Sequence, residues 1–313
     1  MFQNRYWRSY PGWLQMVLFA MMAFSLLSFM QVVAFVLIPN ITTTPVAGLT
    51  HISASSSRAD VNGFLTMQAL MASGLFLLPS ILFAYLTHPK PFGYLGLRKP
   101  GKAIHWLLVP IAMVALMPFI LWLGALFSKI DMGPMLKEMQ EQNNRVMQAL
   151  LKFSSAGDFV KALLVMAILP AIAEELFFRG VIMRMIHWRM KRMVHVVVLS
   201  ALVFAVMHSN PQGLPSIFIS GVVLALMYYW TGSLWLSMLA HLLNNGLQIA
   251  LLYIGNTNAA VKSVIESNEM PVTYVIVGLV VFAGSFYLLW KNRTPLPYDW
   301  SDDYAGEDGT ELS

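Results

Sequence analysis

Runs of apolar residues long enough to cross a bilayer alternate with short polar segments along the chain. A membrane-spanning helix needs about 20 mostly apolar residues. Eight runs approach or exceed that length, at Trp13–Ile38, Phe64–Leu86, Ile104–Phe127, Phe159–Phe178, Met193–Met207, Leu214–Trp230, Ser233–Ile254 and Pro271–Trp290. The fifth and sixth runs are short, so we expect them to pack among other helices or to line a cavity. The pattern predicts an all-α polytopic membrane protein with about eight transmembrane helices.

The composition agrees with this pattern. Hydrophobic residues make up 58% and charged residues 11% of the chain, and the mean hydropathy is +0.64. Soluble domains carry about 25% charged residues. There is no cysteine, which excludes disulfides, thiolate nucleophiles and iron–sulfur sites. The first run is too long for a signal-peptide core and is predicted to be a retained anchor.

Cationic residues cluster between the apolar runs and predict a topology. The clusters contain Arg5 and Arg8, then Lys90, Arg98, Lys99 and Lys102, then Arg184, Arg189, Lys191 and Arg192, and finally Lys291 and Arg293. With eight spans all of them fall on one side, which the positive-inside rule assigns to the cytoplasm together with both chain ends. No basic stripe is interleaved with aromatic residues, so the bilayer and not a nucleic acid is the expected partner.

Two segments lie outside this pattern of spans. Met135–Phe153 has apolar residues at helical spacing and predicts an amphipathic helix on the outer surface, or a plain connecting helix. The acidic tail after Pro297 is predicted to be disordered. The resulting division is residues 1–158 with spans one to three, 159–254 with spans four to seven, 255–296 with span eight, and 297–313 as the tail.

Ionisable groups at membrane depth are costly and therefore informative. Adjacent Glu174 and Glu175 diverge by about 100° on a helix, while Glu175 and Arg179 are four residues apart and predict an ion pair. Glu174 is then left for general acid or base chemistry, at the predicted cytoplasmic end of the fourth span. The alternative is that both glutamates belong to an interfacial salt-bridge network.

Two further spans carry polar residues of the same kind. His208 closes the fifth span, where a capping or interfacial role is the alternative. In the seventh span, His241 and Asn245 are four residues apart and share one helix face, and Asn244 could substitute for Asn245. This pair is suited to metal ligation or to stabilising an oxyanion, although an interhelical polar clamp would use the same residues.

These groups favour hydrolytic chemistry when they are taken together. Glu174, His208, and His241 with Asn245 come from three different helices and could converge on one site. Such a site could activate a water through a general base or a metal and stabilise the tetrahedral intermediate.

The motifs resemble those of the CPBP intramembrane proteases, a family named for CAAX-prenyl proteases and bacteriocin-processing enzymes. They are, in order, Glu174-Glu175-Leu-Phe-Phe-Arg179, Phe204-Ala-Val-Met-His208 and His241-Leu-Leu-Asn244-Asn245. The resemblance covers about residues 159–254 and implies a membrane-associated protein or peptide as the substrate. It also implies a cavity that opens toward the cytoplasmic half of the membrane. The anchor and the Ser/Thr-rich outer loop fit a bacterial inner membrane protein.

The resemblance also implies roles for individual residues. Glu174 and His208 would activate the water, His241 and Asn245 would support the oxyanion, and Glu175 and Arg179 would be structural. If zinc is used, Glu174, His208 and His241 would hold it; two histidines and a glutamate are compatible with zinc without requiring it. Two other classes of function are weighed beside the protease, a non-catalytic scaffold that keeps the fold and a proton-coupled transporter.

Overall fold

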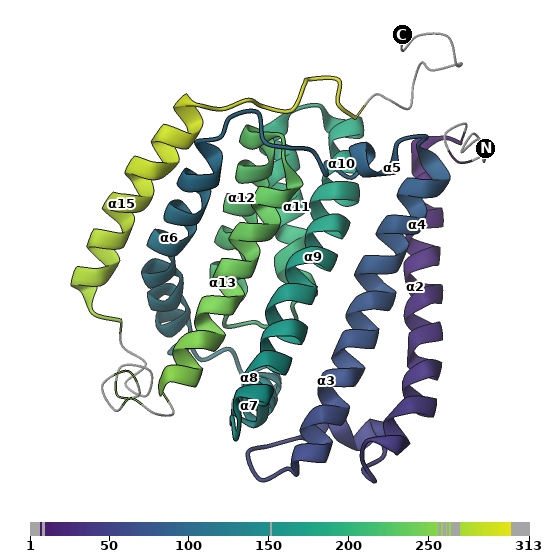
Figure 1. Ribbon diagram of the computed structural model, residues 1–313, viewed down its shortest axis with the longest axis vertical. Helices are drawn as coiled ribbons and strands as arrows, with labels where there is room; N and C mark the ends of the chain where they lie inside the picture. The colour runs from purple at the N-terminus through teal and green to yellow at the C-terminus, as the bar shows by residue number, and fades with distance from the viewer. Residues whose placement is uncertain are drawn as a thin grey trace.

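The computed structural model describes residues 7, 10–150, 152–255, 258, 261, 263 and 270–301, and these residues contain no β-strand. Eight long helical segments run side by side (Figure 1). Their bounds are α2 Gly12–Leu37, α3–η3–α4 Arg58–Thr87, α6 His105–Phe127, α8–η4–α9–η5–α10 Ala156–Met190, α11 Met193–Met207, α12 Leu214–Thr231, α13 Leu234–Gly255 and α15 Val272–Lys291. The predicted all-α architecture of a polytopic membrane protein is confirmed.

Six helical segments among the described residues are long and apolar enough to cross a membrane by themselves. The other two are the α11 helix, which is only 15 residues long, and α13, whose 22 residues include His241, Asn244, Asn245 and Gln248. These polar residues lower the hydropathy of α13. Both helices that deviate from a simple transmembrane pattern carry candidate site residues, since His208 caps α11 and His241 lies in α13.

The two ends of the bundle are distinguished by their loops. At one end, His105 Nε2 lies 3.0 Å from the Asn292 carbonyl, and the Leu234 N–H donates to the Gly96 carbonyl. This end carries the start of α2 and the end of α15 (Figure 1), and we call it the terminal end. At the other end, Gln212 donates to the Ser128 carbonyl; we call this the loop end. The cationic segments 90–102, 189–192 and 291–293 all lie at the terminal end.

The fourth span differs from its prediction. The apolar run was expected to end at Phe178, but the helix continues to Met190. It can do so because Arg179 and Arg184, which would otherwise mark a loop, are both buried in protein. Arg184 donates to the Tyr94 carbonyl and stacks on the Tyr94 ring. Glu174 therefore lies near the middle of a 35-residue helical segment and not at its end, as was predicted.

Two π-helical segments, Leu164–Ile168 and Leu176–Ile182, interrupt this long helix on either side of α9 Leu169–Glu175. A π-helical turn inserts a residue and shifts the helix face that follows it, and such turns are frequent at functional sites. Glu174 and Glu175 occupy the short α-helical stretch between the two. This local geometry aims the two carboxylates at different neighbours.

The second span begins earlier than predicted, at Arg58 instead of Phe64. Ser57 and Asp60 form a capping box, because the Ser57 hydroxyl accepts from the Asp60 N–H and the Asp60 carboxylate accepts from the Ser57 N–H. Such a box satisfies amide groups that the first helical turn leaves open. The polar residues before Phe64 are thus helical.

The amphipathic segment forms α7 Pro134–Leu150, close to its predicted bounds. Its buried residues Ala149 and Leu150 pack into an apolar cluster with Leu49 and Val61. Asn143 donates to the Ser209 carbonyl in the loop after α11. The α7 helix therefore lies across the loop end of the bundle (Figure 1).

The C-terminal tail differs from its prediction over residues 297–301. Trp300 and Ser301 are buried, and Ser301 Oγ lies 2.8 Å from His187 Nδ1. The Trp300 ring also packs against the Arg184 guanidinium. This aromatic residue and its partners anchor a segment whose acidic composition alone suggested disorder. The remaining acidic residues, 302–313, and the N-terminal Arg5 and Arg8 lie outside the described residues.

Candidate active site

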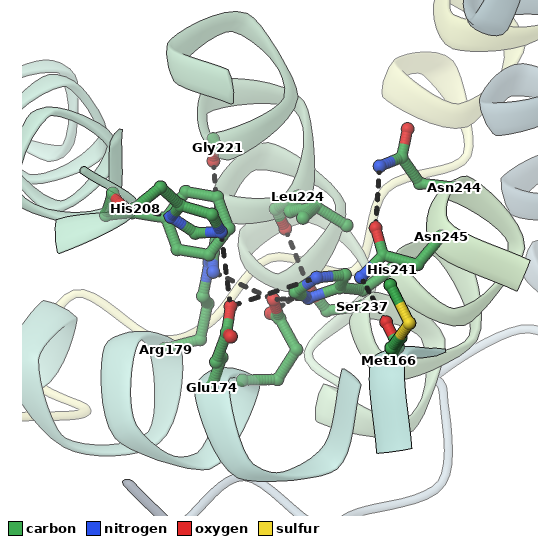
Figure 2. A network of polar contacts seen from close by, with 12 residues as sticks. Met166, Glu174, Arg179, His208, Gly221, Leu224, Ser237, His241, Asn244 and Asn245 are labelled. Carbon is green, nitrogen blue, oxygen red and sulfur yellow. Dashed lines mark hydrogen bonds and ion pairs between the residues drawn. The ribbon is translucent and has the colours of Figure 1, made fainter. Parts of the chain in front are cut away.

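Three helices bring Glu174, His208 and His241 together (Figure 2). Glu174 belongs to α9, His208 caps the C-terminal end of α11, and His241 begins the third turn of α13. Glu174 Oε2 lies 3.6 Å from His208 Nε2 and 3.9 Å from His241 Nε2. The predicted convergence of a carboxylate and two imidazoles is therefore present in the fold.

A buried ion pair between Arg179 and Glu175 lies next to these residues. Arg179 Nη1 donates to Glu175 Oε1 at 2.8 Å, and both side chains are fully buried. His241 Nδ1 lies 2.9 Å from the same carboxylate oxygen, while Ser237 donates to Glu175 Oε2 at 2.6 Å. The predicted Glu175–Arg179 pair is present. The pair has a second role, because Glu175 also orients the His241 ring.

Phe204 is the apolar centre of the site. Its ring lies 4.5 Å from that of His208 and 5.8 Å from that of His241. The Arg179 guanidinium lies 4.5 Å from its centroid, a cation–π distance. Phe204 thus separates the buried arginine from the two histidines and limits the orientations of both rings.

The hydrogen bonds at the Nδ1 atoms assign the tautomers of both histidines. His208 Nδ1 lies 2.7 Å from the Phe204 carbonyl, which can only accept, so Nδ1 carries the hydrogen. His241 Nδ1 faces the Glu175 carboxylate and carries a hydrogen for the same reason. In the neutral rings both Nε2 atoms are then unprotonated acceptors. Both of them point toward Glu174 Oε2, which is buried and has no hydrogen-bond partner among the described residues.

The site is open only in part. The exposed fraction of the side chain is 30% for His208, 13% for Glu174 and 3% for His241. His208 is therefore the most exposed of the three side chains and His241 the most buried.

Asn245 is on the predicted helix but is not directed at Glu174. Its Nδ2 donates to the Met166 carbonyl at 3.5 Å, and its Oδ1 accepts from Asn244 at 3.0 Å. The two asparagines lie one turn beyond His241, on the side nearer the end of α13 (Figure 2). Asn245 lies on the same helix face as His241, as predicted, but its side chain contacts Asn244 and Met166 and not the Glu174 carboxylate.

The residues match zinc in chemistry but not in arrangement. Two imidazole Nε2 atoms and a carboxylate oxygen are suitable donors, with bonds of about 2.0–2.1 Å that put tetrahedral ligand atoms about 3.3 Å apart. The observed separations from Glu174 are wider, at 3.6 and 3.9 Å. Among the described residues no group of three or more His, Asp or Glu side chains is arranged to hold a metal.

Sequence reasoning did not identify Ser237 or Gly221. The Ser237 hydroxyl contacts both the Glu175 carboxylate and the Leu224 carbonyl, and Arg179 Nη2 donates to the Gly221 carbonyl at 3.0 Å. Ser237 could have been found, because it lies four residues before His241 and so shares its helix face. Nothing in the sequence signals the Gly221 carbonyl, since any residue supplies one.

Replacing Ser237 with alanine is expected to lower the free energy of unfolding by about 1–3 kcal/mol, because a buried carboxylate oxygen loses its donor. Turnover should fall less than in any variant of Glu174, because Ser237 acts on His241 only through Glu175. Thermal unfolding in detergent and a peptide-cleavage assay check both effects. Ser285→Ala is the matched control, since that hydroxyl bonds only to carbonyls of its own helix. Equal losses of stability in the two variants would contradict the role of Ser237.

Ser209, next to His208, accepts a hydrogen bond from Asn143 of α7 at the loop end of the bundle. The cytoplasmic termini and the opening of the cavity toward the cytoplasm stay predictions.

Comparison with protein families gives one match. Residues 156–247 match the family of type II CAAX prenyl endopeptidases described as Rce1-like. No curated protein and no solved structure matches the chain. The matched segment runs from α8 into α13 and contains all three motifs, so the resemblance to the CPBP proteases is confirmed over these residues. The family that these residues match is one of CAAX-type intramembrane proteases.

Proposed function

We propose that this chain, whose residues 156–247 carry the pattern of the type II CAAX prenyl endopeptidase family, hydrolyses a peptide bond in a membrane-associated protein or peptide. In this proposal Glu174 and His208 activate the attacking water. One observation carries it: the buried Glu174 Oε2 lies 3.6 Å from an imidazole nitrogen that is itself an acceptor. Two acceptors at this distance need a donor between them.

A water molecule meets that need. It can lie about 2.8 Å from each of two acceptors that are 3.6 Å apart and donate one hydrogen to each. With both hydrogens engaged, a lone pair of the water oxygen is free to attack a peptide carbonyl. In this proposal Glu174 takes the proton as the C–O bond forms.

The same proton completes the reaction. Attack produces a tetrahedral intermediate with an oxyanion, and Glu174 then protonates the leaving nitrogen as the C–N bond breaks. Asn245 is the proposed oxyanion donor, because an amide nitrogen carries two hydrogens and the bond to Met166 uses one. His241 serves the oxyanion only when its Nε2 is protonated, since Nδ1 is held by Glu175.

Replacing His208 with alanine is expected to lower kcat by about 10²–10⁴-fold, because the water loses one of its two acceptors. His195→Ala is the matched control, since His195 is an exposed residue on the same helix. Initial rates on a membrane-anchored peptide, with purified protein in nanodiscs, check this. A His208→Ala enzyme as fast as the His195→Ala control would contradict the role of His208.

Removing metal is expected to leave the cleavage rate unchanged, because the wide separations at Glu174 suit a bridging water better than zinc ligation. The measurement is the cleavage rate before and after dialysis against a chelator, with bound metal quantified in the same samples. Activity that disappears on dialysis and returns with zinc alone would contradict the water mechanism. It would make Glu174, His208 and His241 zinc ligands.

A further inference from the structure

A pocket of about 210 Å³ lies at the loop end, between the segment that follows α6, the first turn of α7 and the loop before α12. Its lining includes the charged residues Lys129, Asp131 and Lys137, together with Gln212. A single water needs only about 10–15 Å³, so the pocket has room for a group of several heavy atoms. It is distinct from the candidate active site, whose carboxylates and histidines do not line it.

The charged side chains of this pocket are not neutralised by one another. Lys129, Asp131 and Lys137 form no ion pair with any residue that the structure describes. Both lysines are exposed, and the Asp131 carboxylate accepts from the Gly133 N–H through Oδ1 at 3.0 Å, which leaves Oδ2 for another donor. Unpaired charges of both signs in one pocket suit a ligand that carries an anionic and a cationic group.

The pocket lies at the depth of the lipid headgroups. The 23 residues of α6 end at Phe127 and extend about 34 Å at 1.5 Å per residue, slightly more than the roughly 30 Å of a hydrocarbon core. The residues that follow α6 are therefore at the surface of the bilayer. Ile130, which lines the pocket, is 48% exposed, and Leu126 is 46% exposed. A group in the pocket thus has apolar protein surface beside it.

We propose that this pocket binds the headgroup of a phospholipid that carries both a phosphate and a primary ammonium group, as phosphatidylethanolamine does. Lys129 and Lys137 bind the phosphate, because lysine binds phosphate oxygens as a point charge. Asp131 accepts hydrogen bonds from the ammonium, and the exposed Ile130 contacts an acyl chain. An acidic peptide or a free phosphate suits the pocket less well, because Asp131 repels an anion and the apolar surface has no partner in either.

The pocket is connected to the candidate active site through the loop that joins α11 to α12. Gln212 donates to the Ser128 carbonyl at 3.4 Å and lies four residues after His208. Ser209 has a φ of 49°, a left-handed conformation that a serine keeps only where its surroundings hold it. A bound headgroup stabilises this loop and thereby the position of His208. This consequence for catalysis rests on the proposed protease function, whereas the binding of lipid does not.

The binding is tested by native mass spectrometry of the full chain from micelles with equal amounts of phosphatidylethanolamine, phosphatidylcholine and phosphatidylglycerol. The wild type is expected to retain phosphatidylethanolamine selectively, because choline has no N–H to donate and glycerol has no cation. Lys129→Gln/Lys137→Gln and Asp131→Asn should each lower this retention by about three- to tenfold. Lys99→Gln/Lys102→Gln is the matched control, because it removes the same charge from exposed lysines at the terminal end and should retain lipid like the wild type.

Three results would overturn the lipid site. Equal retention of all three lipids by the wild type would indicate only the general lipid shell of a membrane protein. Unchanged selectivity in both pocket variants would place the bound lipid elsewhere. Displacement of the lipid by an equal concentration of soluble phosphoethanolamine, or of an acidic peptide, would make that molecule the occupant of the pocket.

The connection to catalysis is tested by cleavage rates in nanodiscs with and without phosphatidylethanolamine. The wild type should be about fivefold faster with this lipid, a coupling at the lower end of those usual between two sites, and Lys129→Gln/Lys137→Gln should be equally fast in both. Equal wild-type rates in both bilayers, with selective retention intact, would overturn the coupling to the loop. No cleavage in either bilayer would contradict the protease function and leave the lipid site standing.

Discussion

Replacing Glu174 with glutamine is expected to lower kcat for peptide hydrolysis by about 10²–10⁴-fold, the usual contribution of a general acid or base. Glutamine keeps the size of the side chain but cannot take the proton from water. Folding should be little affected, because Glu174 Oε2 has no hydrogen-bond partner among the described residues and lies 3.6 Å or more from both histidine nitrogens. The measurement is a steady-state rate in nanodiscs beside thermal unfolding in detergent.

Glu138→Gln is the matched control for this variant, because Glu138 is an exposed glutamate of α7 outside the site. It should cleave like the wild type. A Glu174→Gln protein that is folded and retains the wild-type rate would remove Glu174 from the mechanism. A Glu174→Gln protein that fails to fold would instead make Glu174 a structural residue.

Replacing Arg179 with methionine is expected to lower the free energy of unfolding by about 3–5 kcal/mol, the cost of leaving one member of a buried ion pair uncompensated. Arg179 neutralises Glu175, caps the Gly221 carbonyl and packs on Phe204. Its loss also frees Glu175, so the orientation of His241 and the turnover rate should suffer. Unfolding in mixed micelles measures the loss of stability.

The double variant Glu175→Gln/Arg179→Met tests the reason for this loss. With the carboxylate neutral, most of the stability should return, since the penalty arises from an unpaired buried charge. Arg145→Met is the surface control, because Arg145 and its partner Glu141 are about half exposed, and exposed pairs contribute little. A double variant no more stable than Arg179→Met would indicate that packing on Phe204, and not the charge, is what matters.

The spans could be predicted from the sequence because their signals are local. A run of apolar residues reports a helix wherever it packs, and a spacing of four residues reports a shared face. This is why the Glu175–Arg179 pair is found as predicted. The same reasoning put the end of the fourth span too early, at Phe178. Arg179 and Arg184 are residue types expected in a loop, but here both are buried in protein.

Features that depend on several helices could not be predicted in this way. The orientation of His241 depends on Glu175 in another helix, and the partner of Asn245 is a backbone carbonyl at Met166. Trp300 is buried because the tail meets Arg184 across the terminal end of the bundle. Each of these contacts joins residues that are distant in sequence, and no spacing rule applies to them.

The most direct test of the central claim is to incubate purified wild-type protein in nanodiscs with a mixture of membrane-anchored and lipidated peptides and to identify products by mass spectrometry. Glu174→Gln and His208→Ala proteins are the parallel samples. The proposed chemistry predicts defined cleavage products that form with the wild type and disappear in both variants. Folded wild-type protein that releases no product beyond those of the variants would contradict the protease function and favour a scaffold that keeps the fold.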